Sequence, residues 1–199
     1  MVREISAGGV VLRNKDGEWW MAAIELPADD LSAKDLPAHE LAAPGQPADA
    51  SPGGMVAELA EQVTDKSSAA PKRTRRKKPK TVLCLPKGLV DPGEKALEAA
   101  LREVREETGI NATPVTKLAD IKYVYVRSWG DGERVFKIVS FYLLRYESGR
   151  IDNIANEMRV EVARARWVRL AEAPKLLAYR GEKQMARKAL QYLESHAEI

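Results

Sequence analysis

Two segments near the N-terminus are rich in Val, Ile and Trp, and a short polar segment separates them. The first covers residues 4–13, the second covers residues 18–26, and the sequence NKDG lies between them. β-Branched and aromatic residues favour strands, whereas Asn, Asp and Gly favour the backbone conformations of a tight turn. This pattern predicts a β-hairpin.

The clearest helical pattern of the sequence lies at residues 92–108. Asp91 and Pro92 are typical of the first positions of a helix, and Glu94 stands where its carboxylate could close a capping box. Gly109 follows the pattern, and glycine commonly ends a helix because it readily adopts the left-handed conformation. We therefore expect a helix from about Pro92 to Thr108.

One face of this helix is apolar and the neighbouring flank is acidic. A rotation of about 100° per residue brings four side chains to the apolar face, namely Leu97, Leu101, Val104 and Thr108. Three carboxylates come together on the flank beside it, at positions i, i+3 and i+4: Glu103, Glu106 and Glu107. The apolar face is expected to pack on a sheet, which would leave the carboxylates beside that contact.

The rest of the patterned sequence predicts further strands and two final helices. The strands are expected at residues 81–85, 117–127, 134–146 and 163–168, and the helices at residues 171–178 and 182–196. A turn with the sequence GDG joins the two long strands.

Residues 28–80 differ in composition from the segments on both sides. They are dominated by Ala, Pro, Asp, Gly and Ser and contain almost no β-branched or aromatic residues. Such a segment cannot bury enough apolar surface to offset the entropy of ordering it. We expect a largely disordered insertion, with at most a short helix at residues 55–63, in one domain formed by residues 1–27 and 81–199.

Composition is typical of a globular protein with a single domain. The 199 residues are 45% hydrophobic and 31% charged, and no apolar run approaches the roughly 18 residues that a membrane-spanning helix needs. The N-terminal sequence lacks the apolar core of a signal peptide, so a cytoplasmic protein without a membrane partner is expected. Cys84 is the single cysteine, which excludes an internal disulfide, and we interpret it as a small buried side chain in a strand.

The net charge of +3 is unevenly distributed. Residues 72–80 (KRTRRKKPK) contain seven basic residues and no acidic one, whereas residues 28–71 contain eight acidic residues and two lysines. Because the basic character lies in one segment, nucleic acid is not the expected partner, and a flexible basic linker is the commoner role of such a run. A protein that contacts nucleic acid through residues 72–80 is kept as an alternative.

The three clustered glutamates are candidates for a metal site. Glutamate-rich helix faces are usually only solvated, but clustered carboxylate oxygens also suit hard ions such as Mg²⁺ or Mn²⁺. The spacing around them distinguishes the two interpretations. From Gly88 the sequence contains five residues, Glu94, seven residues and then REVREETGI, which ends at Ile110.

Residues 88–110 match the signature of the Nudix hydrolases at every defined position. The preceding LPKG, the segment SAGGVVLR near the N-terminus and the strand that contains Trp167 also resemble this family. The LPKG sequence resembles the branch that contains the diadenosine polyphosphate hydrolases. The resemblance implies an α/β fold, an α/β/α sandwich with a mixed sheet interrupted here by the insertion, and hydrolysis of a nucleoside diphosphate linked to another group.

The resemblance also implies roles for individual residues. Glu103, Glu106 and Glu107 would bind Mg²⁺ or Mn²⁺, and the carbonyl of Lys87 is a further candidate ligand. Glu94 and Arg102 would orient these groups. Glu103 or Glu106 could accept the proton of the attacking water, and many relatives use a later loop glutamate instead, for which Glu157 and Glu161 are candidates.

Substrate contacts are predicted from charge and from position in the chain. Lys87, Arg127 and Lys137 could contact phosphates, and Trp129 beside a turn could stack on a base. We therefore expect Mg²⁺-dependent hydrolysis of a small nucleotide, either a dinucleoside polyphosphate or a nucleoside triphosphate.

Two alternatives concern the same site. The signature at residues 88–110 is called the Nudix box. A nucleotide-binding regulator without catalysis usually lacks some of the box glutamates, and this sequence keeps them all. A hydrolase of ADP-ribose or of a non-nucleotide diphosphate would also keep them. Oligomeric state is not predicted by any of these patterns.

Overall fold

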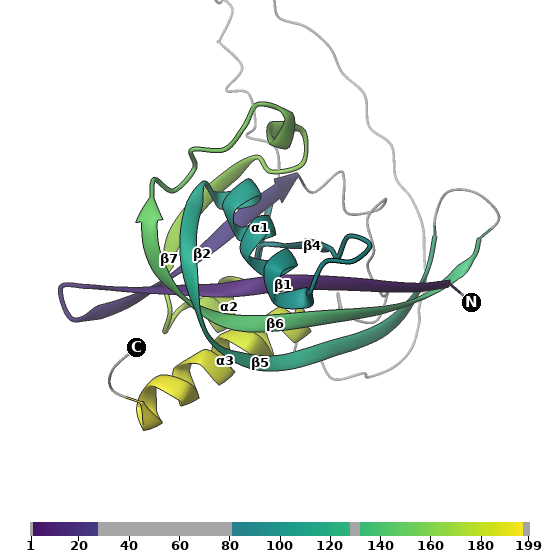
Figure 1. The fold of residues 1–199 in the computed structure, drawn as a ribbon. Coiled ribbons are helices and arrows are strands. Elements are labelled where there is room, and N and C mark those ends of the chain that lie inside the picture. The colour runs from purple at the N-terminus through teal and green to yellow at the C-terminus, as the bar shows by residue number, and fades with distance from the viewer. Residues whose placement is uncertain (1, 28–80, 128–131, 197–199) are drawn as a thin grey trace, which may run out of the picture. The chain divides into compact units, whose positions relative to one another are not determined.

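The computed structural model describes residues 2–27, 81–127 and 132–196, which fold around one mixed sheet (Figure 1). The strands are β1 (Val2–Lys15), β2 (Glu18–Pro27), β3 (Thr81–Cys84), β4 (Lys87–Leu89), β5 (Ile110–Val126), β6 (Arg134–Gly149) and β7 (Arg164–Arg169). Their order is β3-β2-β1-β6-β5, with β4 paired to β1 and β7 paired to β2. β1 and β6 run parallel, and all other neighbours run antiparallel.

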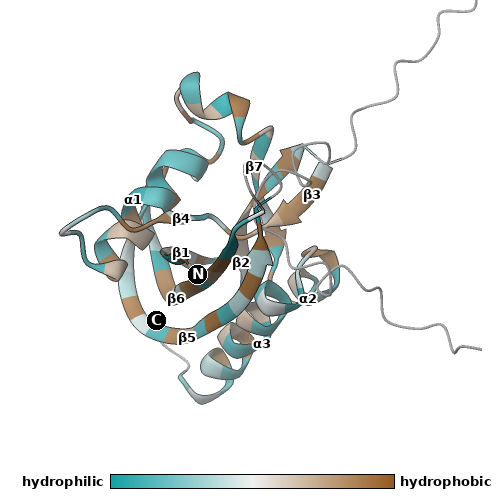
Figure 2. Ribbon diagram, turned by 90° about the vertical axis from the view of Figure 1, so that its right-hand side faces the viewer, coloured by the Kyte–Doolittle hydropathy of each residue, from teal (hydrophilic) through white to brown (hydrophobic). Residues whose placement is uncertain are grey.

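Helices cover both faces of the sheet. They are α1 (Ala96–Thr108), α2 (Ala173–Leu176) and α3 (Arg180–Ser195), and η2 (Glu157–Val160) is a short 3-10 helix in the loop before β7. Successive side chains of β1 point to opposite faces. Val10 therefore belongs to the apolar cluster that contains Met185 of α3, whereas Val11 packs with Val104 of α1. Figure 2 shows α1 and α3 on opposite sides of the strands. The predicted α/β/α sandwich with a mixed sheet is confirmed.

The N-terminal hairpin is confirmed as predicted. β1 and β2 pair antiparallel, and Lys15 faces Glu18 at the end of the ladder. Gly17 has a φ of 80°, and its N–H donates to the side-chain oxygen of Asn14 over 3.2 Å. The side chain of Asn14 thus stabilises the turn that its sequence predicts.

The predicted beginning of the first helix is wrong. α1 begins at Ala96, after the N-cap residue Lys95, and the carboxylate of Glu98 accepts the N–H of Lys95 over 3.1 Å. Residues 91–94 form a turn instead, because Gly93 has a φ of 86° and Glu94 is held by Arg102. The predicted end is confirmed, since Gly109 has a φ of 76° and its N–H donates to the carbonyl of Arg105.

The later elements occur as predicted but with different bounds. β5 begins directly after the C-cap of α1, and three register shifts against β6 accommodate its irregular first half, which contains Pro114. α2 has only four residues, and among the described residues no helix is long and apolar enough to cross a membrane. Cys84 is fully buried, as expected. The predicted insertion at residues 28–80, its short helix and the start of the GDG turn lie outside the described residues.

Candidate active site

The site is centred where α1 crosses β4. Gly88 in β4 lies directly beneath Glu103, because a Cβ atom at Gly88 would lie 2.2 Å from the carboxyl carbon of Glu103. Any larger residue at this position would displace the carboxylate. The box glycine thus allows Glu103 to lie against the strand.

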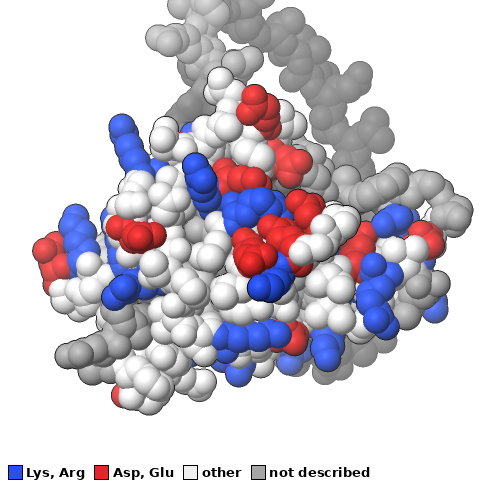
Figure 3. Space-filling model, in the orientation of Figure 1, with Lys and Arg blue, Asp and Glu red and all other residues white. Residues whose placement is uncertain are grey.

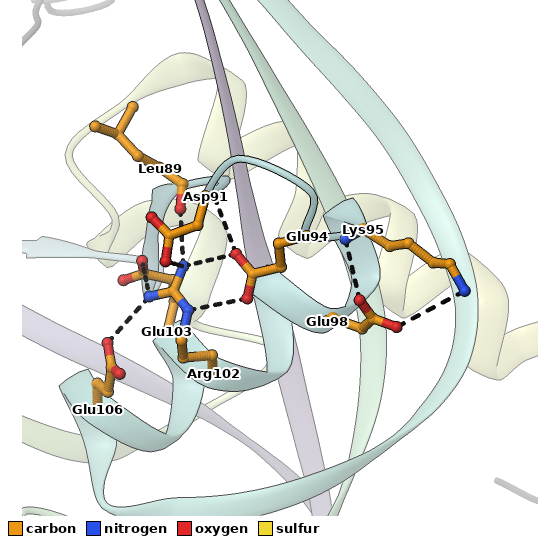
Figure 4. A network of polar contacts seen from close by, with 8 residues as sticks. All are labelled: Leu89, Asp91, Glu94, Lys95, Glu98, Arg102, Glu103 and Glu106. Atoms are coloured by element: carbon orange, nitrogen blue, oxygen red, sulfur yellow. Dashed lines mark hydrogen bonds and ion pairs between the residues drawn. The ribbon is translucent and has the colours of Figure 1, made fainter.

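Arg102 connects the loop before α1 to two of the box glutamates (Figure 4). Its guanidinium donates to both carboxylate oxygens of Glu94 over 3.0 Å, to Glu103 over 2.7 Å and to Glu106 over 3.1 Å. It also donates to the carbonyl of Leu89 over 2.9 Å. The hydrogen bond to Glu94 is the main reason why the pKa of Arg102 is raised and that of Glu94 is lowered. Arg102 therefore contacts Glu103 and Glu106, and Glu94 holds Arg102. Their effect on a metal stays a prediction.

Glu107 is the most buried of the three predicted metal ligands. Its side chain is held by the N–H of Lys87 over 2.8 Å, and the residue is 7% exposed. Burial raises the pKa of Glu107 to about 8, opposed by Lys87 and assisted by Glu103 and Glu161. Burial also raises the pKa of Glu103, against the effect of Arg102. Desolvation therefore raises the pKa values of these two carboxylates more strongly than their mutual repulsion does.

The carboxylates are chemically suited to a hard divalent cation, although their oxygen atoms are not grouped around one point in this structure. Within the described residues no group of three or more His, Cys, Asp or Glu side chains is arranged to hold a metal ion, since Arg102 joins Glu103 to Glu106 and Lys87 holds Glu107. Two buried carboxylates with raised pKa values would be stabilised by a nearby positive charge. Their oxygen donors suit Mg²⁺ or Mn²⁺.

The side chain of Lys87 is paired with a glutamate of α3. Its ammonium lies 3.0 Å from a carboxylate oxygen of Glu182 in α3 and 5.9 Å from the ring centre of Tyr179. Burial alone would lower the pKa of Lys87, but Glu182 and other neighbouring groups raise it above the ordinary value. The predicted contact between Lys87 and phosphate stays a prediction, as does coordination through its carbonyl. The sequence did not indicate Glu182, because an acidic residue in the first turn of a helix is usually exposed.

Arg127 and Lys137 come together at one carboxylate. Glu4 in β1 lies 2.7 Å from the guanidinium of Arg127 and 3.7 Å from the ammonium of Lys137, and it accepts the hydroxyl of Tyr125 over 3.0 Å. Lys137 is only 7% exposed. Trp129, the fourth predicted substrate contact, lies outside the described residues.

Of the two loop glutamates, Glu161 is electrostatically closer to the site. Glu157 begins η2 and Glu161 follows it, and both are exposed. The carboxylate of Glu161 contributes to the raised pKa of Glu107. This observation favours Glu161 over Glu157 as the loop glutamate.

Asp152 fixes the loop that carries these glutamates. It has a φ of 69°, and its N–H donates to the carbonyl of Thr108 at the end of α1 over 2.8 Å. Its carboxylate accepts the N–H of Ala165 over 2.7 Å and pairs with Arg159 over 2.8 Å. The sequence did not indicate Asp152, because its partners are brought to it only by the fold.

A groove of about 650 Å³ lies beside Glu106, between the second half of α1 and the loop after β6. Its polar lining includes Arg102, Arg105, Glu106, Asn111, Arg150 and Asn153. Within the described part of the chain, neither Arg105 nor Arg150 forms an ion pair. Figure 3 shows acidic and basic side chains intermixed over α1 on this side of the molecule.

The sequence profile of the NUDIX domain matches residues 65–189, which is more than half of the chain. The fold, the box on β4 and α1, and this match agree. The chain therefore belongs to the NUDIX family, a family of pyrophosphohydrolases.

Two curated relatives are similar over much of the chain. This chain is 36% identical over 136 residues to the "Putative mutator protein MutT4" of Mycobacterium tuberculosis. The aligned segment covers 68% of this chain and 52% of that protein. The chain is also 34% identical over 112 residues to the asymmetrical bis(5'-nucleosyl)-tetraphosphatase of Mus musculus. This alignment covers 54% of this chain and 69% of that protein. The chain thus spans about half the length of the first relative.

Solved structures share the fold. A C. elegans Ap4A hydrolase binary complex superposes with a TM-score of 0.56 at 19% identity, over 96% of this chain and 98% of that one. A NUDIX hydrolase from Nitrosomonas europaea gives a TM-score of 0.53 at 14% identity, over 96% of this chain and 90% of that one. The family resemblance seen in the sequence is confirmed.

Proposed function

We propose that this protein hydrolyses a pyrophosphate bond in a nucleoside diphosphate derivative with the help of Mg²⁺ or Mn²⁺. The observation that carries the proposal is the complete box, in which Glu103 and Glu107 are buried beside β4 and Glu106 is held by Arg102. A solvated helix face would leave all three carboxylates exposed. A regulator that only binds nucleotide would not need the full set of glutamates.

Glu103, Glu106 and Glu107 are the residues that would hold the metal, which neutralises phosphate charge and acidifies a bound water. Arg102 keeps Glu103 and Glu106 adjacent, and the N–H of Lys87 fixes the direction of Glu107. A carboxylate oxygen of Glu103, Glu106 or the loop residue Glu161 then accepts the proton of the attacking water.

The substrate class we propose carries several phosphates, as in a dinucleoside polyphosphate or a nucleoside triphosphate. Arg105 and Arg150 supply positive charge in the groove beside Glu106, whereas Arg127 and Lys137 are already paired with Glu4 and would have to exchange that partner for phosphate. Each further phosphate needs a counter-charge, so several cations favour long phosphate chains. The relative named as an asymmetrical bis(5'-nucleosyl)-tetraphosphatase supports the same class.

A substrate screen tests the proposal. With Mg²⁺ present, we expect a higher kcat/KM for dinucleoside polyphosphates or nucleoside triphosphates than for ADP-ribose, and no turnover after chelation. Lys137→Ala should narrow the difference in activation free energy between these substrates, calculated from their kcat/KM values, by about 1.5–3 kcal/mol if Lys137 holds a phosphate. Best turnover of ADP-ribose, with Lys137→Ala affecting all substrates equally, would contradict the proposed substrate class.

A further inference from the structure

A buried carboxylate on the opposite face of the sheet holds the strand that carries the box glycine. Glu182 in α3 is 2% exposed. One of its carboxylate oxygens accepts the N–H of Leu85 over 2.9 Å, and the other lies 3.0 Å from the ammonium of Lys87. Glu182 therefore contacts residues 85–88 at two points, one on the backbone and one on a side chain.

The same short segment contacts the metal-binding glutamates on its other side. The N–H of Lys87 donates to Glu107 over 2.8 Å, and Gly88 lies beneath Glu103. The segment is also joined to β1, because the N–H of Gly9 donates to the carbonyl of Pro86 over 3.1 Å. A displacement of residues 85–88 would therefore change the positions of Glu103 and Glu107.

Fold stability alone does not account for this arrangement. Removing two charges from water is costly, and replacing a buried ion pair with apolar side chains of similar volume is often neutral or stabilising. On the same helix, α3, the apolar side chains of Met185 and Ala189 already pack in the core cluster against the sheet. The charged pair provides something that those contacts do not, which is a fixed direction for the Leu85 and Lys87 backbone.

We propose that Glu182 is a positioning residue: it holds residues 85–88 from the α3 side of the sheet. It thereby fixes the backbone N–H that Glu107 accepts and the glycine beneath Glu103, the two buried carboxylates that would bind the metal. This inference rests on the proposed function, because it assigns Glu182 a role in the same metal site. Glu182 itself lies on the far side of the strand and does not touch the reacting atoms.

The test uses Glu182→Gln in the full chain, with Glu194→Gln as the control. Both residues are on α3, but Glu194 is exposed. The glutamine keeps the volume and can accept the N–H of Leu85, but it removes the charge that holds Lys87. We expect tenfold or greater weakening of Mn²⁺ binding, measured by electron paramagnetic resonance, and a tenfold to hundredfold fall in kcat with KM changed less than threefold.

A second measurement needs neither metal nor substrate. In the metal-free protein the amide hydrogen of Lys87 should exchange at least tenfold faster in Glu182→Gln, while the amide of Val104 in the middle of α1 keeps its rate. If the glutamine variant does not fold, Glu182→Asp keeps the charge but shortens the reach, and the same changes are expected from it.

The outcomes separate this inference from the proposed function. Wild-type Mn²⁺ affinity, kcat and Lys87 exchange in a variant that only melts at a lower temperature would overturn the positioning role. If the wild-type protein itself neither binds Mn²⁺ nor cleaves any substrate of the screen, the proposed function fails, and the inference fails with it.

Discussion

At the scale of single residues, the site consists of carboxylates whose environments differ although their positions on the helix are adjacent. Glu107 is buried and held by a backbone N–H, Glu103 is buried over a glycine, and Glu106 is exposed and paired with Arg102. Helical spacing brings the three residues to one flank. Only packing against β4 decides how much water each one retains.

Glu107→Gln should leave the fold intact and lower kcat by several orders of magnitude. The change removes one metal-binding charge without altering volume, and a neutral amide can still accept the N–H of Lys87. Steady-state kinetics in saturating Mg²⁺ measures the effect, and circular dichroism checks the fold. Glu147→Gln on the exposed part of β6 is the control and should behave as wild type. Near-normal turnover of Glu107→Gln would exclude Glu107 as a ligand.

At the scale of elements, the loop between β6 and β7 depends on Asp152, which connects it to the end of α1 and to the start of β7. Burial alone would raise the pKa of Asp152, but Arg159 and the N–H of Ala165 lower it below the ordinary value. The residue also adopts the left-handed conformation, which Asp and Asn tolerate better than most residues. The loop is therefore ordered by one side chain in an uncommon backbone conformation.

Asp152→Asn should lower the free energy of unfolding by about 1 kcal/mol at pH 7, because it removes a charge-assisted pair that solvent partly screens. Because the folded pKa is lowered, this stabilisation is present above the unfolded pKa and is lost as pH falls through the folded pKa. Urea unfolding at several pH values measures the difference from wild type, which should shrink in acid.

Asp16→Asn is a matched control for Asp152, since Asp16 also has a positive φ but lies exposed in the N-terminal turn. It should have little effect at any pH. An Asp152→Asn effect that does not change with pH, or that equals the effect of Asp16→Asn, would contradict the proposed role of the carboxylate.

At the scale of the whole molecule, the two parts of the domain are joined by a pair of strand ends that lie opposite each other. Pro27 at the end of β2 pairs with Thr81 at the start of β3. The long intervening sequence therefore begins and ends at neighbouring positions of the sheet. A short connection is geometrically sufficient to link these two strands.

Replacing residues 28–79 with a short Gly/Ser linker should preserve kcat and KM. Closing a shorter loop costs less entropy, by about 0.6 kcal/mol for each halving of its length, so thermal stability should be equal or slightly higher. Kinetics and thermal denaturation of the shortened chain measure both. A shortened chain that folds but does not turn over substrate would show that the removed residues contribute to the site.

The resemblance to the Nudix hydrolases, rather than a local pattern, implied the packing of helices on both faces of the sheet. The sequence by itself determined the hairpin, the end of the first helix and the three glutamates on one flank. These features follow from local periodicity and from residues with strong backbone preferences, such as Gly109. The same local rules misplaced the start of α1, because Arg102 holds Glu94 in a turn that lies before the helix.

Only the tertiary structure decided which charges are buried and what they contact. The partner of Lys87 lies 95 residues further along the chain, and the charge of Glu161, in a loop, helps to raise the pKa of Glu107. Neither interaction leaves a pattern of spacing in the sequence. Periodicity reports the face on which a side chain lies, whereas burial depends on what packs over that face. The depth of Glu107 and the role we propose for Glu182 therefore arise from the packing of two helices on opposite sides of one strand, β4.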